Sequence, residues 1–355
     1  MFYRTGIASE VSNMRVEEFD YNLPPSLIAQ YPSLQRGESR LMVLDRCRGT
    51  IEHREFRDIS DYLHPGDLLV SNNSRVLPAR LIGKKLTGGK CEVLLIPSWN
   101  GEQGRWKVLI RGSGKIKRRT RIQFGDDLDA EVEVEKDGRG KISFSSQREV
   151  LSILQEIGHV PLPPYIRRSD EPLDKDRYQT IFAERDGSIA APTAGLHFTH
   201  SLLESLRDQG VIIASITLHI GIGTFTPVKA RQIEDHTMEA EWIEIRKTTS
   251  QEIENTKRME GRVIAVGTTV TRALESFSDG NGGVRSGNGM SSLFIHSPYQ
   301  FRVIDGLVTN FHLPKSTLVM LVSAFAGKDF LMKAYREAIE KKYRFYSYGD
   351  AMLIL

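Results

Sequence analysis

The sequence predicts an α/β fold, a mixed sheet with flanking helices, into which an antiparallel β-barrel is inserted. Three observations favour this fold class. Short apolar runs bounded by polar or glycine residues occur near the start of the chain, and several short strand patterns with glycine turns follow. From about residue 157 onward, strand and helix patterns alternate. We therefore expect a discontinuous α/β domain at residues 14–77 and 157–355, a barrel at residues 78–156, and an N-terminal extension at residues 1–13.

The composition narrows the class of protein. The 355 residues are 40% hydrophobic and 26% charged, which suits a folded chain of about two domains. No apolar run is long enough to predict a membrane span, and residues 1–13 do not resemble a secretory signal. Two cysteines, Cys47 and Cys91, predict neither a disulfide framework nor a cysteine-based metal site, and favour a reducing cytoplasm. The net charge of +3 leaves a nucleic-acid partner possible.

The first two segments contain mainly strand patterns. Residues 41–44 and 67–70 are short apolar runs that predict buried strands. Residues 130–135 alternate strictly between small apolar residues and glutamates, which predicts a strand with one buried face. Residues 150–157 return to a helical period.

The third segment predicts alternating helices and strands. Ser201 followed by Glu204 predicts a capping box for a helix that Gly210 ends, and Ser316 predicts the N-cap of an apolar helix. Strands are expected at residues 211–220, 262–267, 292–295 and 307–311, and further helices at residues 248–259 and 269–276. Residues 278–290 contain five glycines and predict a mobile loop.

The common cofactor motifs are absent. The sequence has no phosphate-binding GxxxxGK[ST] loop, no HExxH and no calcium-binding loop. Gly221 and Gly223 follow a predicted strand, but Thr226 stands where a dinucleotide fingerprint needs its third glycine. A nicotinamide dehydrogenase is therefore disfavoured, and no metal site is predicted.

Polar residues gather where predicted strands end, which is where α/β sheets bind ligands. Thr193, Gly195 and His197 precede a predicted helix, and His219 lies beside Gly221 and Gly223. Two further loops contain Asp235, His236, Glu239 and Glu241, and Asn310, His312 and Lys315. Proton transfer by these imidazoles and carboxylates is one interpretation. Satisfied structural groups, chain turns and helix caps are the other, and the residues alone leave both open.

Two features favour contact with nucleic acid. Asn72, Asn73 and Arg75 directly follow a buried strand, where amides read base edges or phosphates, or cap a turn. Residues 111–121 of the predicted barrel hold six cations and no acid. We call them the basic ribbon: Arg111, Lys115, Lys117, Arg118, Arg119 and Arg121. Such a ribbon suits a phosphate backbone, although a solvated face is the alternative.

The ordered motifs from residue 14 to the C-terminus resemble one family, the S-adenosylmethionine:tRNA ribosyltransferase-isomerases of queuosine biosynthesis. The motifs are "FDYNLPPSLIAQYP", "NNSRVLPARL", "GHVPLPPYI", "RYQTIFA", "GSIAAPTAGLHF", "HIGIGTF", "VGTTVTRALES", "LVTNFHLPKSTLVMLVSAFAG" and "RFYSYGDAMLI". The leader before Met14 and the glycine-rich loop depart from the family pattern.

The resemblance implies a two-domain protein that acts on tRNA carrying 7-aminomethyl-7-deazaguanine at the wobble position, and we expect a monomer in the cytoplasm. The ribosyl part of S-adenosylmethionine would move to the aminomethyl nitrogen and rearrange, giving epoxyqueuosine and releasing adenine and methionine. S-adenosylmethionine would be a cosubstrate, the anticodon loop the partner, and no other cofactor is implied.

This reaction needs groups that exchange protons near pH 7, and imidazole is the first candidate. The catalytic candidates are His197, His219 and His312, with Glu239 or Asp350 as carboxylate partner; which one is the base stays open. The donor-binding candidates are Thr193, Gly195, Gly221, Gly223, Thr224, Thr268, Arg272 and Asn310. The tRNA-binding candidates are Asn72, Asn73, Arg75 and the basic ribbon.

Two other functions, from different classes of protein, are alternatives to this one. A tRNA methyltransferase would use the same donor but yield S-adenosylhomocysteine, and no recognisable methyltransferase glycine loop is present. A non-catalytic RNA adaptor would consume no donor, and it would have no need for so many polar residues at strand ends.

Overall fold

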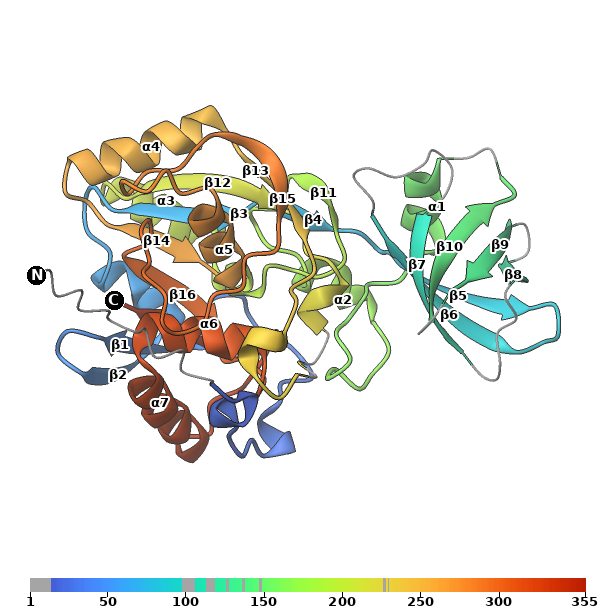
Figure 1. The fold of residues 1–355 in the computed structure, drawn as a ribbon, viewed down its shortest axis with the longest axis horizontal. Coiled ribbons are helices and arrows are strands. Elements are labelled where there is room, and N and C mark those ends of the chain that lie inside the picture. The colour runs from blue at the N-terminus through green and yellow to red at the C-terminus, as the bar shows by residue number, and fades with distance from the viewer. Residues whose placement is uncertain are drawn as a thin grey trace, which may run out of the picture.

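The computed structural model describes residues 14–97, 106–112, 119–125, 128–135, 138–146, 149–225, 228 and 230–355, with backbone alone for residues 224 and 225. These residues form a mixed sheet with flanking helices and a separate closed barrel (Figure 1). The predicted fold class is therefore confirmed. None of the helices in this described part is long and apolar enough to cross a membrane.

The α/β domain is built on a sheet of nine strands, whose centre is parallel. In spatial order the strands are β15 (Gly287–Ser291), β13 (Glu241–Ile245), β12 (Ile212–Leu218), β3 (Leu68–Asn72), β14 (Val263–Val266), β16 (Gly306–Asn310), β17 (Ala351–Ile354), β1 (Arg40–Asp45) and β2 (Thr50–Glu55). Strand β3 pairs in parallel with β12 on one side and with β14 on the other. The chain order therefore changes direction at β3, and such a point in an α/β sheet favours a ligand site beyond the carboxyl ends of the strands.

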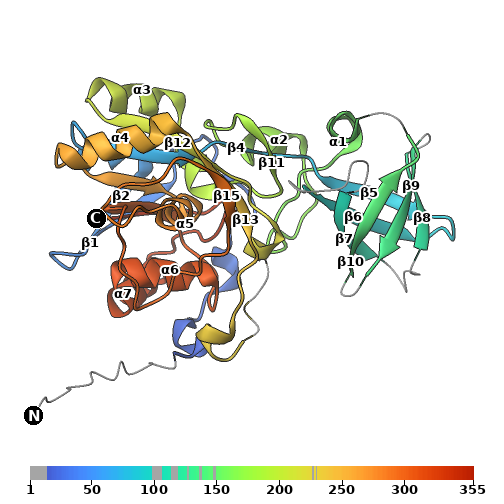
Figure 2. The same cartoon turned by 45° about the horizontal axis from the view of Figure 1, so that its top comes forward.

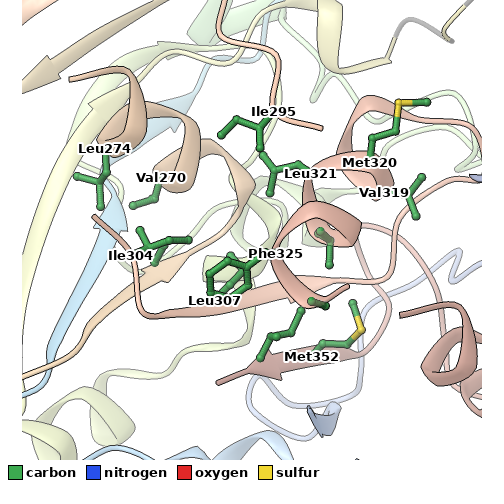
Figure 3. Close-up of a cluster of buried hydrophobic side chains, with 14 of the residues drawn as sticks. Val270, Leu274, Ile295, Ile304, Leu307, Val319, Met320, Leu321, Phe325 and Met352 are labelled. Atoms are coloured by element: carbon green, nitrogen blue, oxygen red, sulfur yellow. The ribbon is translucent and has the colours of Figure 1, made fainter. Parts of the chain in front are cut away.

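Both faces of this sheet are covered, because successive side chains of a strand point to opposite faces. Leu68 and Val70 of β3 join one apolar cluster and Leu69 joins the other. The first cluster includes residues of α4 (Lys247–Arg258), α5 (Thr268–Ser276), α6 (Thr317–Ala326) and α7 (Lys328–Glu340). Figure 3 shows α5 and α6 packing their apolar side chains over β16 and β17. The second includes residues of α3 (His200–Asp208) and of the 3₁₀ helix η3 (Phe56–Asp61).

The barrel is antiparallel and closed. Its strands are β5 (Arg80–Lys85), β6 (Lys90–Ile96), β7 (Trp106–Gly112), β8 (Arg119–Phe124), β9 (Leu128–Val134) and β10 (Arg139–Phe144), closing in the order β10-β7-β6-β5-β8-β9. Ala130 and Val132 are buried while Glu131 between them is exposed, as the alternation predicts. Helix α1 (Val150–Ile157) adds Ile153 and Leu154 to the barrel core.

Two segments of the chain lie side by side and join the barrel to the α/β domain (Figure 2). We call these segments, which meet at Arg80 and His159, the neck. Arg80 and His159 form an antiparallel bridge there, with His159 N donating to the Arg80 carbonyl at 2.8 Å. The Arg80 guanidinium also pairs with Asp170 at 2.5 Å.

Smaller elements surround the neck and the N-terminal segment. Strand β4 (Ser74–Val76) pairs in parallel with β11 (Arg185–Ser188), and α2 (Pro172–Arg177) lies near them. The remaining short 3₁₀ helices are η1 (Val16–Phe19), η2 (Pro25–Leu27), η5 (Thr193–His197), η6 (Ile222–Phe225) and η7 (Ile233–Asp235).

Three local predictions are wrong. Helix α3 is capped by Thr199, whose Oγ1 accepts a hydrogen bond from Leu202 N at 3.1 Å, so Ser201 lies inside the helix. The glycine-rich segment is not a loop throughout, because Gly287–Ser291 pairs with β13 as an edge strand. Residues 292–295 form no strand, although Ile295 is buried in the core. The Ser316 N-cap is confirmed by its 3.2 Å bond from Val319 N.

Candidate active site

A cavity lies beyond the carboxyl ends of β14 and β16, and we call it the central cavity. It encloses about 800 Å³ of empty space, part of which opens to solvent. This space is in the range of small-molecule sites. Four of the predicted donor-binding residues line it: Thr193, Thr268, Arg272 and Asn310. The catalytic candidate His312 lines it too, and Tyr165, Phe311 and Tyr346 supply aromatic surface.

The loop after β16 orients His312 toward this cavity. Its Nε2 lies 2.7 Å from Thr309 Oγ1, and its backbone N donates to the Tyr335 hydroxyl at 3.0 Å. Burial lowers the pKa of His312 to about 3. The imidazole is therefore neutral at pH 7 and can accept a proton.

His197 lies behind the wall of the central cavity rather than in it. Asn310 Nδ2 donates to the Tyr346 carbonyl at 3.1 Å and to His197 Nε2 at 3.0 Å, so Nε2 is an acceptor. The other ring nitrogen lies 2.6 Å from Ser39 Oγ, and the ring stacks on Phe56. Both nitrogens are thus engaged, and His197 serves to hold Asn310. Its predicted catalytic role stays a prediction.

A second cavity lies between the two domains, and we call it the interdomain cavity. It encloses about 880 Å³ of empty space, part of it open to solvent, and Ile220 lines both cavities. Lys107 and Arg139 of the barrel face residues of the α/β domain across it. Of the predicted site residues, His219, Gly221, Glu239 and Glu241 line it.

His219 is supported by a chain of hydroxyl groups. Its Nδ1 lies 2.7 Å from Ser74 Oγ, which lies 2.6 Å from Ser188 Oγ. Its ring stacks on Trp242 with centroids 5.2 Å apart. Burial, together with the charge of Arg185, lowers the pKa of His219 to about 4. A neutral imidazole oriented by a second group is the usual arrangement of a catalytic base.

Glu239, one of the predicted carboxylates, lies between the two domains. Glu239 pairs with Arg139 and so connects the α/β domain to the barrel. A Cβ placed at Gly223 would lie 3.1 Å from the Glu239 Cβ, so this glycine allows the close approach. The side chain of Thr224 lies outside the described residues.

A buried ion pair joins the walls of the two cavities. Arg272 of the central cavity donates from Nη1 to Glu241 Oε2 at 2.6 Å, and both side chains are about 95% buried. The other Glu241 oxygen accepts a bond from Gly221 N at 3.1 Å.

Two further site candidates lie away from both cavities. Asp350 accepts hydrogen bonds from the backbone N of Arg40 and of Arg344 and pairs with both side chains, which makes it a structural carboxylate. Gly195 packs against Thr180 inside η5. Neither residue lines the central or the interdomain cavity, and their predicted catalytic and donor-binding roles stay predictions.

Asn72 and Asn73, predicted to contact tRNA, are both about 98% buried, and this contact stays a prediction. Asn72 Oδ1 accepts from Leu218 N at 3.1 Å, and its Nδ2 donates to the Leu218 carbonyl. Asn73 bonds Thr217 and Glu184. The amides therefore tie the end of β3 to its neighbours. Arg75 is exposed beside Asp186.

The basic ribbon is described only in part. Arg111, Arg119 and Arg121 are exposed on the barrel. Arg119 pairs with Glu131 at 3.8 Å and Arg121 with Asp129 at 3.1 Å, both at the surface. Lys115, Lys117 and Arg118 lie outside the described residues.

Sequence reasoning missed five residues around the interdomain cavity: Ser74, Lys107, Arg139, Ser188 and Trp242. Ser74 and Ser188 stand within recognised motifs, but a serine in a motif gives no sign that its hydroxyl reaches a histidine. Lys107 and Arg139 reach the cavity only because the barrel closes and lies against the α/β domain.

Three buried histidines predict acid sensitivity. Their folded pKa values, about 3 for His197, 4 for His219 and 3 for His312, lie below the unfolded value of about 6.5. The unfolded chain therefore binds more protons between these limits. We expect their stabilising contribution to be complete above about pH 6.5 and to be lost as the pH falls toward 3, by up to about 1.4 kcal/mol per pH unit per histidine.

Urea unfolding at several pH values measures this effect. Between pH 5 and 6, His197→Gln should reduce the change of the unfolding free energy with pH by about 1.4 kcal/mol per pH unit. This reduction corresponds to one proton fewer taken up on unfolding. A slope unchanged by this substitution would contradict the buried, neutral state of His197.

The fold is an α/β domain with an inserted barrel that borders one of the two cavities. A family model described as "Queuosine biosynthesis protein" matches residues 16–354. The chain belongs to this family.

Relatives named S-adenosylmethionine:tRNA ribosyltransferase-isomerase resemble the chain over nearly its whole length. The one from Sulfurihydrogenibium sp. is 51% identical over 343 residues, which are 96% of this chain and all of the relative. The one from Halothermothrix orenii is 52% identical over 345 residues, with the same coverage. A crystal structure of S-adenosylmethionine tRNA ribosyltransferase from Thermotoga maritima is 41% identical, covers 95% of this chain and all of that one, and superposes with a TM-score of 0.55. The chain is thus an enzyme of the transferase–isomerase class.

Proposed function

We propose that this enzyme transfers and isomerises the ribosyl moiety of S-adenosylmethionine onto the aminomethyl group of 7-aminomethyl-7-deazaguanine at the tRNA wobble position. Adenine and methionine leave, and the tRNA carries epoxyqueuosine. The names of the relatives support this reaction. The structural observation that carries it is the pair of cavities sharing Ile220, because a transfer between a small donor and a macromolecule needs two adjoining sites.

The donor fits the central cavity better than the interdomain cavity. The central cavity lies wholly within the α/β domain and has aromatic walls for an adenine ring. The interdomain cavity is bordered by Lys107 of the barrel, whose charge suits an RNA phosphate, and by Trp242, on which a base can stack. The wobble base is already in a single-stranded loop, so little unstacking is needed for it to enter.

His219 and His312 are both neutral at pH 7, the form in which an imidazole can act as a base, although their lowered pKa values make them weak bases. The sulfonium acidifies the hydrogens of the adjacent 5′ carbon, and a neutral imidazole can remove one of them. An imidazolium formed in such a site is a strong acid. It can then give the same proton to the departing adenine, which is a poor leaving group as an anion. We assign the main role to His219 because Ser74 orients it and because its neighbour Ile220 lines both cavities.

The proposed partners follow from this reaction. They are tRNA, bound through its anticodon loop, and S-adenosylmethionine, which serves as cosubstrate with no metal or other cofactor. We propose that the enzyme acts as a monomer in the cytoplasm, where its RNA substrate is.

One assay tests the function. The full-length protein is incubated with S-adenosylmethionine and tRNA that carries the aminomethyl base, and the small molecules and the RNA mass are analysed. Adenine, methionine and a heavier RNA are expected. Control tRNA with unmodified guanine should give none of them. Formation of S-adenosylhomocysteine would instead indicate a methyltransferase, and no consumption of donor would indicate an RNA adaptor.

A further inference from the structure

Arg272 is the only residue with a permanently charged side chain among the described residues that line the central cavity. The residue is about 95% buried. Its Nη1 donates to Glu241, and its Nε donates to the Leu293 carbonyl at 3.1 Å. Its Nη2 has no protein partner within the described part of the chain. An arginine has five N–H donors in a rigid fork, so this guanidinium has donors left for a ligand.

The N-terminus of α5 adds to the same site. Thr268 opens this nine-residue helix and Arg272 follows one turn later, so both lie on the helix face that borders the cavity. Free backbone N–H groups and the helix dipole make such an end favourable for an anion. The Thr269 hydroxyl, which also lines the cavity, is buried and has no hydrogen-bond partner in the described structure.

Glu241 fixes the guanidinium without filling this site. It comes from β13 and lines the interdomain cavity, so it approaches Arg272 from outside the central cavity. Its two oxygens accept from Arg272 and from Gly221 N. The pair therefore leaves Arg272 Nη2 as a charge-assisted donor on a residue that lines the same cavity as the first turn of α5.

We propose that Arg272 Nη2 and the N-terminus of α5 bind the carboxylate at the amino-acid end of the donor, and that Glu241 is a positioning residue for Arg272. This inference rests on the proposed function, because it takes S-adenosylmethionine as the donor. That molecule has a sulfonium, an ammonium and one carboxylate, so the carboxylate is its only group that an anion site can select.

Equilibrium binding of S-adenosylmethionine and of its decarboxylated counterpart tests the proposal. The full-length wild-type protein should bind the carboxylate-bearing compound about 10- to 100-fold more tightly, the usual effect of a hydrogen bond to a charged group. The double variant Arg272→Gln, Glu241→Gln leaves no unpaired buried charge. It should bind both compounds with similar affinity.

Glu241→Gln alone tests positioning. Its amide keeps an oxygen that can accept from Arg272 but loses the charge, so the preference for the carboxylate should fall about threefold or more. The matched control is the ion pair of Arg262 and Asp67, 2.5 Å apart, which lies at the amino ends of β14 and β3. Arg262→Gln with Asp67→Asn should retain the full preference, and thermal unfolding identifies variants that fail to fold.

The binding and adenine-release experiments distinguish a failure of the carboxylate site from a failure of the proposed function. If wild-type protein releases adenine yet binds both compounds equally, the carboxylate site is wrong and the function stands. A double variant that is folded and keeps the preference would likewise overturn the site. If wild-type protein neither binds S-adenosylmethionine nor releases adenine, the proposed function and this inference both fall.

Discussion

His219→Ala is expected to lower the rate of adenine release by about 10²- to 10⁴-fold while the variant still binds tRNA. The imidazole lines the interdomain cavity beside the shared wall at Ile220, where donor and acceptor would meet. With a pKa of about 4 it is neutral at pH 7, the protonation state that a general base requires. Single-turnover adenine release and filter retention of labelled tRNA measure the two properties separately.

Two variants control for indirect effects. His219→Asn retains an atom close to the position of Nδ1 for Ser74 but removes Nε2, so it should be nearly as inactive as His219→Ala. His236→Ala removes a half-buried histidine of the neighbouring loop that packs on Phe294 and lines neither cavity, and it should keep wild-type turnover. Adenine release by His219→Ala at the wild-type rate would show that the assigned role is wrong.

The same pKa predicts the acid limb of the wild-type pH profile. A base whose pKa is about 4 is active above that value and becomes protonated as the pH falls through it. We expect kcat/KM to show no break near 6.5, the ordinary histidine value, and to fall only as the pH approaches 4. A break near 6.5 that disappears in His219→Asn would contradict the lowered pKa.

Neutralising Lys117, Arg118 and Arg119 together should weaken tRNA binding about 100-fold at 0.1 M salt. Each cation that neutralises a phosphate releases counterions. For a single strand, each such contact adds about 0.7 to the steepness with which the logarithm of the binding constant falls with the logarithm of the salt concentration. Loss of three contacts should therefore flatten the slope by about two. Fluorescence titration of tRNA at four salt concentrations measures both quantities.

A matched triple variant tests whether position matters. Arg48, Arg54 and Arg57 are exposed and lie on or beside β1, β2 and η3, at the end of the molecule opposite the barrel (Figure 1). Changing these three to Gln removes the same net charge and should leave the salt slope almost unchanged. Equal effects of the two triple variants would mean that overall charge, and not the basic ribbon, governs binding.

The parallel core of the sheet was predictable because its strands are apolar on both faces. Strand β3 shows this pattern: Leu68 and Val70 belong to one apolar cluster, and Leu69 belongs to the other. All three side chains are fully buried, so the apolar run predicts a strand between two layers of helices. The edge strand β15 was not predictable in the same way. Its glycines contribute no apolar surface, and only the backbone bonds to β13 hold it as a strand.

Several of the predicted site residues line the two cavities, but the sequence does not separate their roles. Sequence patterns treat His197, His219 and His312 alike, since each stands in a loop after an apolar run. Contacts made in the folded protein distinguish the three histidines. Ser39 and Asn310 engage both nitrogens of His197 from 158 and 113 residues away, and Ser74 reaches His219 from 145 residues away. No local pattern encodes such distant hydroxyl and amide partners.

The neck carries a mechanical consequence. Two antiparallel chain segments bridged at Arg80 and His159, and anchored by Asp170, resist torsion about their common axis much more than a single linker would. Bending across the pair meets less resistance. If the barrel moves relative to the α/β domain, we expect it to bend about the neck, which would change the width of the interdomain cavity.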